Sequence, residues 1–97
     1  MKIRFEWDPG KAASNLRKHR VSFEIAMHAF LDPFAMAGQD RIEDGEQRWQ
    51  TLGMVDGRVL LLVAHTVREE GDIEVIRIIS ARVAEPKERR RYEQEIR

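Results

Sequence analysis

The stretch that decides the fold is Ile73–Tyr92, which reads IEVIRIISAR over residues 73–82 and VAEPKERRRY over residues 83–92. Its first part predicts a strand, because the β-branched residues that it contains suit a pleated and buried surface. Pro86 then favours the start of a helix, since proline is preferred in the first helical turn. We therefore expect a buried strand that leads directly into a basic helix.

An arginine interrupts the apolar part of this strand. Because successive side chains alternate between the two faces of a strand, Arg77 points away from the face of Ile76 and Ile78. A guanidinium inside an apolar strand is costly unless it meets an anion. One interpretation is a structural ion pair with a nearby carboxylate. The other is a phosphate contact at the end of the sheet, where Arg77, Arg82 and Arg89–Arg91 converge.

Length and composition limit the class of protein. The 97 residues suffice for one domain with a single core, so residues 1–97 are expected to fold as one unit. Hydrophobic residues make up 42% of the chain and charged residues 35%, a balance typical of globular rather than disordered proteins. No apolar run approaches the roughly 20 residues of a membrane helix. The start of the chain does not resemble a signal peptide, so we expect a cytoplasmic protein.

The residues that usually bind metals are sparse. Cysteine is absent, which excludes disulfides and thiolate sites. The three histidines share no ligand spacing with the acidic residues, so we expect neither a metal site nor another cofactor. Two of these histidines, His28 and His65, are expected to be structural.

Charge is balanced overall but unevenly distributed. Lys and Arg number 17, and so do Asp and Glu, which excludes a protein that coats nucleic acid through bulk charge. Residues 1–20 nevertheless carry six Lys or Arg against two acidic residues. The chain therefore has room for a small basic site that engages a few phosphates.

The first third of the chain predicts one strand and two helices. Alternating polar and apolar residues predict a half-buried strand over residues 3–7. Asp8-Pro9 is typical of a helix start, and this helix runs to about Lys18. Ser22 begins a second helix with apolar side chains at helical spacing, which Asp32-Pro33 ends.

The rest of the chain predicts an antiparallel sheet. In chain order we expect a short strand at 34–37, a polar loop at 41–45, a strand at 46–55, a hairpin turn at Asp56-Gly57, a central strand that includes 59–63 and a turn at 70–72 before the Ile73 strand. The predicted fold is therefore α+β: strand, helix, helix, an antiparallel sheet of about four strands and a C-terminal helix. The helices are expected on one face of the sheet.

A set of short motifs follows one another along nearly the whole chain. They are Phe5-Glu6-Trp7-Asp8-Pro9 with Lys11 and Asn15, Lys18-His19 before Val21-Ser22-Phe23, Asp32-Pro33, Gly45-Glu46 and Arg48 ahead of Gly53, Arg77-Ile78-Ile79-Ser80-Ala81-Arg82, and Glu88-Arg89 before Tyr92-Glu93. Each motif is weak alone, but the ordered set resembles the BrnT family of bacterial toxins.

The resemblance implies a RelE-like ribonuclease fold and RNA cleavage that inhibits translation and growth. It also implies neutralisation by a BrnA-type antitoxin, in a complex of two toxins and two antitoxins that represses its own promoter and touches promoter DNA only through the antitoxin. One position departs from the family pattern, because Arg20 stands where the family usually has glycine. We expect the left-handed conformation there, which costs a non-glycine residue about 1 kcal/mol or more and affects the placement of His19.

Metal-free RNA cleavage needs a base for the 2′-hydroxyl, cations for the phosphate and an acid for the leaving 5′-oxygen. His19 suits the base or the acid, because an imidazole titrates near neutrality, and Glu46 is the rival base. The cationic role suits Arg48, Arg77 and Arg82, whose guanidinium groups match phosphate oxygens. The residues expected to contact RNA are Lys18, Ser80, Arg89 and Tyr92, the last by hydrogen-bonding phosphate or stacking on a base.

Most of these roles have a structural alternative. His19 can simply cap the first helix, and Lys18 can be a surface charge. Glu46 can be the ion-pair partner of Arg48 or Arg77. Tyr92 can dock the terminal helix.

Three functions remain open at this level. The first is an endoribonuclease toxin. The second is a non-catalytic binding module that acts with a DNA-binding antitoxin as an autorepressor. The third is a family member that has lost catalysis and keeps only the antitoxin interface. Since the same arginines would serve binding and catalysis, growth arrest on expression of the chain alone is the observation that favours the first.

Overall fold

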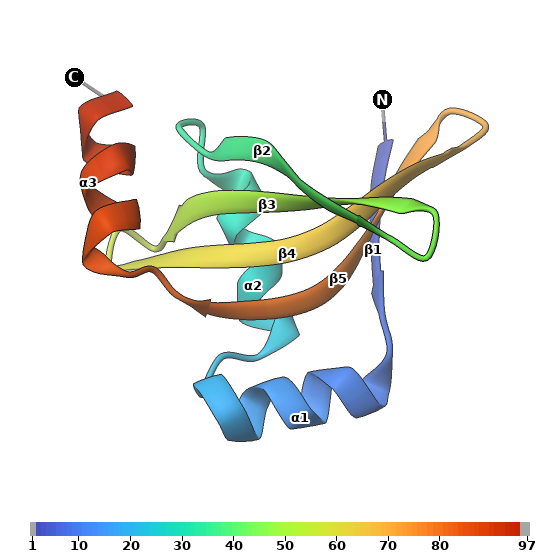
Figure 1. Cartoon of the computed structure of the whole chain (residues 1–97), viewed down its shortest axis with the longest axis horizontal. Coiled ribbons are helices and arrows are strands. Elements are labelled where there is room, and N and C mark those ends of the chain that lie inside the picture. Colours follow the sequence, from blue (N-terminus) through green and yellow to red (C-terminus); the bar gives the residue numbers. More distant parts are fainter. Residues whose placement is uncertain (1, 96–97) are drawn as a thin grey trace.

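The computed structural model describes residues 2–95 and has the predicted order of elements (Figure 1). They are β1 (Lys2–Trp7), α1 (Pro9–His19), α2 (Phe23–Met27), the 3₁₀ helix η1 (His28–Leu31), β2 (Met36–Glu43), β3 (Glu46–Val55), β4 (Val59–Glu70), β5 (Ile73–Val83) and α3 (Pro86–Glu95). The prediction of an α+β fold is confirmed. No helix within these residues is long and apolar enough to cross a membrane.

All the strands join one mixed sheet, in the order β1-β5-β4-β3-β2. The four strands from β2 to β5 are antiparallel neighbours, as predicted. The first strand adds a fifth, parallel to β5, with pairs from Lys2–Ile73 to Trp7–Ile78. The strand at residues 3–7 was predicted, but its place as the fifth strand of this sheet was not, because parallel pairing between the two ends of a chain leaves no local sequence pattern.

Two hairpins have the same turn chemistry. Asp56 and Gly57 have φ angles of 53° and 65°, which confirms the predicted turn. Asp44 and Gly45 have φ angles of 53° and 77° between β2 and β3. Positive φ at both central residues matches the twist of the flanking strands. The predicted loop over residues 41–45 was therefore too long, and the strand predicted at 34–37 begins at Met36 and runs to Glu43.

The sheet has apolar side chains on both faces. On one face α1, α2 and η1 cover a core that includes Phe23, Leu61, Val63 and Ile78. We call this the helix-covered face. The opposite face, which we call the open face, carries a smaller cluster of Leu52, Leu60 and Tyr92, in which Tyr92 belongs to α3. The prediction that all helices lie on one face was therefore wrong, because Tyr92 docks the terminal helix on the other side.

Close packing of η1 on the sheet depends on one glycine. A Cβ atom added to Gly53 of β3 would lie 2.2 Å from the carbonyl oxygen of Ala29. Any larger residue would push η1 away from the sheet, so the glycine allows the helix layer to reach the core.

Candidate functional site

The free edge of β5 shapes the best candidate site. β1 ends at Trp7, opposite Ile78, whereas β5 continues to Val83 and leaves its edge without a strand partner. The buried side chain of Asn15 on α1 fills this gap. Its Oδ1 accepts from the Ala81 N–H at 3.1 Å, and its Nδ2 donates to the Ala81 carbonyl at 2.9 Å. Because buried backbone groups need partners, this contact fixes α1 beside β5.

A bulge opens the surface next to this contact. Ala64 pairs with Ser80 and His65 with Ile78, so Ile79 is an extra residue without a partner on β4. An open pocket of about 230 Å³ lies here between α1 and β5. We call it the α1–β5 pocket, and its lining residues are Lys11, Ser14, Asn15, Lys18, His19, Ile79 and Ser80. It brings together three predicted site residues, Lys18, His19 and Ser80.

Arg20 determines how the chain leaves this pocket. It has φ 61° and ψ 26° at the C-terminus of α1, which confirms the predicted left-handed conformation. Its N–H donates to the Leu16 carbonyl at 3.0 Å and closes the helix. His19 is therefore the last helical residue, and the structure places it on the pocket even without the usual glycine.

Arg77 forms an ion pair on the open face. Its Nη1 lies 3.2 Å from Glu6 on the neighbouring β1, and Arg68 of β4 lies 2.8 Å from the same carboxylate. The hydrogen bond from Arg68, assisted by Arg77, lowers the pKa of Glu6 to about 2 although burial opposes the shift. Arg77 remains 44% exposed, so this single contact leaves donors facing solvent. Its carboxylate partner is Glu6 rather than Glu46.

Arg82 is engaged at the start of α3. Its two terminal nitrogens donate to the two carboxylate oxygens of Glu88 at 2.9 and 2.8 Å. Glu88 also accepts from the backbone N–H of Glu85 at 2.8 Å, and the pair with Arg82 lowers the pKa of its carboxyl. Arg77 and Arg82 thus bind different glutamates. The two arginines lie roughly 13 Å apart along β5, because the bulge leaves four steps of the register between them. The predicted convergence of Arg77, Arg82 and Arg89–Arg91 is not what these contacts show.

Arg48 and Glu46 lie near the β2–β3 turn. Arg48 is largely buried and pairs with Glu43 at 3.2 Å, while its Nε has no partner within residues 2–95. Glu46 is exposed, and its cross-strand neighbour is Glu43. The predicted pairing of Glu46 with Arg48 or Arg77 is therefore wrong.

The two rival bases are far apart. In the register of the sheet Ser80 pairs with Ala64, which pairs with Gln50 of β3. Glu46 is four residues from Gln50, or roughly 13 Å along the strand, and β4 separates β3 from β5. His19 lies on the pocket beside Ser80, so the structure does not bring Glu46 and His19 together.

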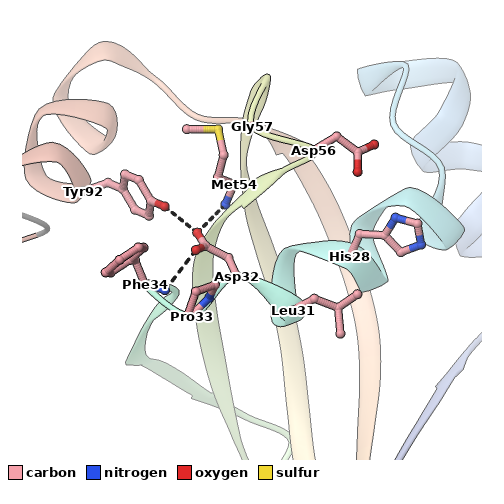
Figure 2. Close-up of a pocket in the computed structure, with 9 residues that line it drawn as sticks. All are labelled: His28, Leu31, Asp32, Pro33, Phe34, Met54, Asp56, Gly57 and Tyr92. Carbon is pink, nitrogen blue, oxygen red and sulfur yellow. Dashed lines mark hydrogen bonds between the residues drawn. The ribbon is translucent and has the colours of Figure 1, made fainter.

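Tyr92 holds α3 on the sheet (Figure 2). It is 3% exposed, and its hydroxyl donates to Asp32 Oδ2 at 2.5 Å. The same carboxylate accepts from the backbone N–H groups of Met54 and Phe34 at 2.8 and 2.9 Å. Burial, together with Asp32, raises the pKa of Tyr92 to about 12. These contacts support the docking alternative for Tyr92, while the half-buried Arg89 lies on the same helix.

The other histidines have different surroundings. His65 is buried, its Nε2 lies 2.8 Å from Thr51 Oγ1, and Phe30 meets its ring edge to face. Burial lowers its pKa, which fits the predicted structural role. His28 is exposed and lines the pocket drawn in Figure 2. Within residues 2–95 no three His, Asp or Glu side chains gather as metal ligands.

Two parts of this surface were not predicted. Glu6 is the carboxylate partner of Arg77, and Lys11 and Ser14 complete the α1–β5 pocket. The positions of Lys11, Ser14 and Lys18 at helical spacing could have grouped them on one side of α1. No local pattern could have paired Glu6 with Arg77, because their contact depends on the register of β1 beside β5.

Comparisons with known proteins agree with this fold. The family profile described as "Ribonuclease toxin, BrnT, of type II toxin-antitoxin system" matches residues 7–88. A similar solved structure is the crystal structure of the Brucella abortus ribonuclease toxin BrnT, with a TM-score of 0.60 and 22% sequence identity. The match covers 88% of this chain and 99% of that chain, and at this identity it shows a shared fold. No curated protein sequence matches the chain.

Proposed function

The chain belongs to the BrnT family of ribonuclease toxins of type II toxin–antitoxin systems, and we propose that it is an active, RelE-like endoribonuclease. In this proposal it cleaves RNA in the cytoplasm and so inhibits translation and growth. The observation that carries the proposal is the α1–β5 pocket, where two lysines, an imidazole and two hydroxyl groups line one open surface. Cations and hydrogen-bond donors of this kind suit a phosphate, and the imidazole suits proton transfer.

Four residues of the pocket have a proposed role in cleavage. The 2′-hydroxyl next to the scissile phosphate is the nucleophile and displaces the 5′-oxygen. His19 either accepts the proton of the 2′-hydroxyl or supplies one to the leaving 5′-oxygen, and water completes the other of these two transfers. Such a positioned acid or base contributes about 10²–10⁴ in rate. Lys11 and Lys18 balance the charge that develops on the phosphate, and Ser80 donates a hydrogen bond to it. No metal ion takes part, because substrate and protein supply the nucleophile and the proton acceptor.

The arginines of the open face extend this site. Arg77 and Ser80 point to the same face of β5, because the bulge at Ile79 lies between them, and Arg77 is half exposed. Arg77 therefore suits the charge that develops on the scissile phosphate. Phosphates farther along the same RNA suit Arg48, Arg82 and Arg89.

His19 is favoured over Glu46 as the base, because His19 shares its pocket with Lys11, Lys18 and Ser80 whereas Glu46 lies near the β2–β3 turn.

The proposed partner is a BrnA-type antitoxin encoded beside the toxin. Membership of a type II toxin–antitoxin family supports a protein antitoxin. We propose a complex of two toxins and two antitoxins, which contacts promoter DNA through the antitoxin and represses its own synthesis.

One observation favours the second candidate function, a non-catalytic binding module that acts with the antitoxin as an autorepressor. Arg48, Arg77 and Arg82 each already contact a glutamate in the free chain. An anion must therefore compete with a carboxylate at each arginine. The α1–β5 pocket weighs against this candidate, because no ion pair occupies Lys11 or Lys18 within residues 2–95.

Cleavage by the purified chain tests the proposal. The chain is stripped of antitoxin, refolded and incubated with end-labelled RNA, together with His19→Ala and the matched control His28→Ala. The wild type and His28→Ala should cleave at the same rate, and His19→Ala should cleave about 10²–10⁴-fold more slowly. A refolded wild type that binds the antitoxin but leaves RNA intact would support the binding module instead.

A further inference from the structure

One end of the helix-covered face has no helix over it. In Figure 1 α2 lies behind the part of the sheet nearer α3 and α1 runs below β5, while the β2–β3 and β4–β5 hairpins extend to the right, away from α3. Three large apolar side chains of this end are exposed: Ile3 by 54%, Ile42 by 69% and Val67 by 37%. Ile3 and Ile42 belong to the two edge strands, β1 and β2, and Val67 to the central β4, so the three side chains span the width of this end of the sheet. Exposed large apolar side chains gathered at one end of a small domain indicate an interaction site.

One of these exposed residues, Val67, lies in the wall of a pocket of about 320 Å³. Its walls include Phe30, Ala37, Trp49, Val67, Glu74 and Ile76. The register shows that these side chains share a face, because Val67 pairs with Ile76, Ile3 pairs with Glu74, and Ile42 pairs with Gln47, two residues before Trp49. The pocket is mostly apolar, with one carboxylate in its wall, and it suits an apolar side chain next to a cation.

Two glutamates face each other at the border of the pocket. Glu69 and Glu74 are cross-strand partners on β4 and β5. Directly opposed side chains on a sheet have Cβ atoms only about 5 Å apart, and like charges in this arrangement destabilise the hairpin. Within residues 2–95 neither glutamate has an ion-pair partner. The nearby arginines, Arg4 and Arg68, bind Glu70 on the opposite face.

We propose that this surface, the uncovered patch of Ile3, Ile42, Trp49, Val67, Glu69 and Glu74, is where the antitoxin docks. The docking segment inserts an apolar side chain into the pocket and places a lysine or arginine on the Glu69–Glu74 pair. This inference rests on the proposed toxin function, because the occupant is the antitoxin of that system. A cation there would relieve the repulsion between the glutamates and give the interface its specificity.

Charge distinguishes this occupant from two others. A second copy of the chain would bring the same patch against itself in a two-fold contact, so two pairs of glutamates would face each other. RNA would place phosphates on carboxylates. Only a partner of opposite charge gains from both parts of the patch, the apolar pocket and its acidic border.

The uncovered patch and the proposed cleavage site are different surfaces. The patch lies on the helix-covered face near the hairpin turns, whereas the α1–β5 pocket lies at the edge of β5 beyond the end of β1. They have no lining residue in common. Variants of the patch should therefore keep the cleavage rate of the wild type and lose only neutralisation by the antitoxin.

The test measures both properties on the same variants, with the purified antitoxin from the adjoining reading frame as the probe. The charge reversal is Glu69→Lys with Glu74→Lys, and a second variant, Ile42→Ser with Val67→Ser, removes apolar contacts without changing charge. Glu24→Lys with Glu93→Lys is the matched charge control. Leu31→Ser with Phe34→Ser tests the exposed apolar residues at the pocket of Figure 2. Calorimetry gives affinity, and RNA cleavage with and without antitoxin gives neutralisation.

Both patch variants should bind the antitoxin about 10²-fold more weakly and resist neutralisation, whereas the charge control and the Leu31–Phe34 variant bind as the wild type does. Wild-type affinity in both patch variants, or weakened binding only in the Leu31–Phe34 variant, would overturn the inference. A wild type that cleaves RNA but does not bind the antitoxin would overturn it and leave the nuclease proposal standing. Binding that depends on the patch in a chain without nuclease activity would support it and contradict the nuclease proposal.

Discussion

The Asn15 side chain hydrogen-bonds both the carbonyl and the N–H of Ala81, at 2.9 and 3.1 Å, as a neighbouring strand would. It also donates to the Val21 carbonyl at 2.9 Å, so it joins α1, the turn after α1 and the free edge of β5. This contact places Lys18 and His19 beside Ser80. The architecture of the candidate site therefore depends on a residue that need not touch substrate.

We expect Asn15→Ala to destabilise the fold by about 2–4 kcal/mol, because it leaves buried backbone groups without partners. Ser14→Ala, its exposed neighbour in the same pocket, is the control and should change stability by less than about 0.5 kcal/mol. Urea unfolding measures both variants. Equal stability of Asn15→Ala and the wild type would show that β5 does not need this contact.

We expect Arg20→Gly to stabilise the chain by about 0.5–1 kcal/mol, because glycine adopts the left-handed conformation at φ 61° without steric cost. Arg17→Gly, one turn earlier inside α1, should instead cost about 1 kcal/mol. Thermal unfolding compares the two variants. A loss of stability in Arg20→Gly would mean that the arginine side chain contributes more than its backbone strain costs.

The pair of Tyr92 and Asp32 predicts a loss of stability in alkali. The pKa of Tyr92 is raised to about 12, so its contribution is complete below the unfolded pKa of about 10 and disappears as the pH rises from about 10 to 12. The expected loss is about 2–3 kcal/mol. The chain has one tyrosine, so Tyr92→Phe should be less stable at neutral pH but should lack this part of the alkaline decline. Urea midpoints between pH 8 and 11.5 would reveal the difference, and parallel curves for both proteins would contradict it.

Arg77 is predicted to act in cleavage more than in folding. Arg77→Ala should lower the cleavage rate by about 10²–10³, the usual loss for one donor aimed at developing charge. Arg77→Lys should restore part of it, because lysine keeps the charge but lacks the planar guanidinium. Glu6→Gln is the control, since it removes the carboxylate partner and leaves the arginine in place. If Arg77→Ala and Glu6→Gln both unfold the protein, the ion pair is structural.

Features that depend on nearby residues were predictable from the sequence. Asp8, Ser22 and Pro86 begin helices as expected, because caps and proline act on the adjacent turn. Asp56-Gly57 forms its hairpin for the same local reason. The equivalent pair Asp44-Gly45 was missed, because the acidic residues around it are also typical of a loop and an edge strand needs no apolar pattern.

Features that depend on distant residues were not predictable. The parallel register of β1 beside β5 decides that Arg77 meets Glu6 and not Glu46, across 71 residues of sequence. Lys18, His19 and Ser80 were each candidates, but their proximity depends on Asn15 and on the bulge at Ile79. α3 packs on the open face because of Tyr92, the one buried residue of this helix.

In the proposed mechanism the substrate's own 2′-hydroxyl attacks the scissile phosphate, with His19 as the proton acceptor or donor. The most direct measurement compares two RNAs that differ by a single 2′-deoxy substitution at the cut site, both incubated with the antitoxin-free chain in excess EDTA. We expect the unmodified RNA to be cut with 2′,3′-cyclic or 3′-phosphate ends, and the deoxy RNA to remain intact there. Cleavage that disappears in EDTA, or products with 5′-phosphates, would contradict this mechanism and indicate a metal-activated water as the nucleophile.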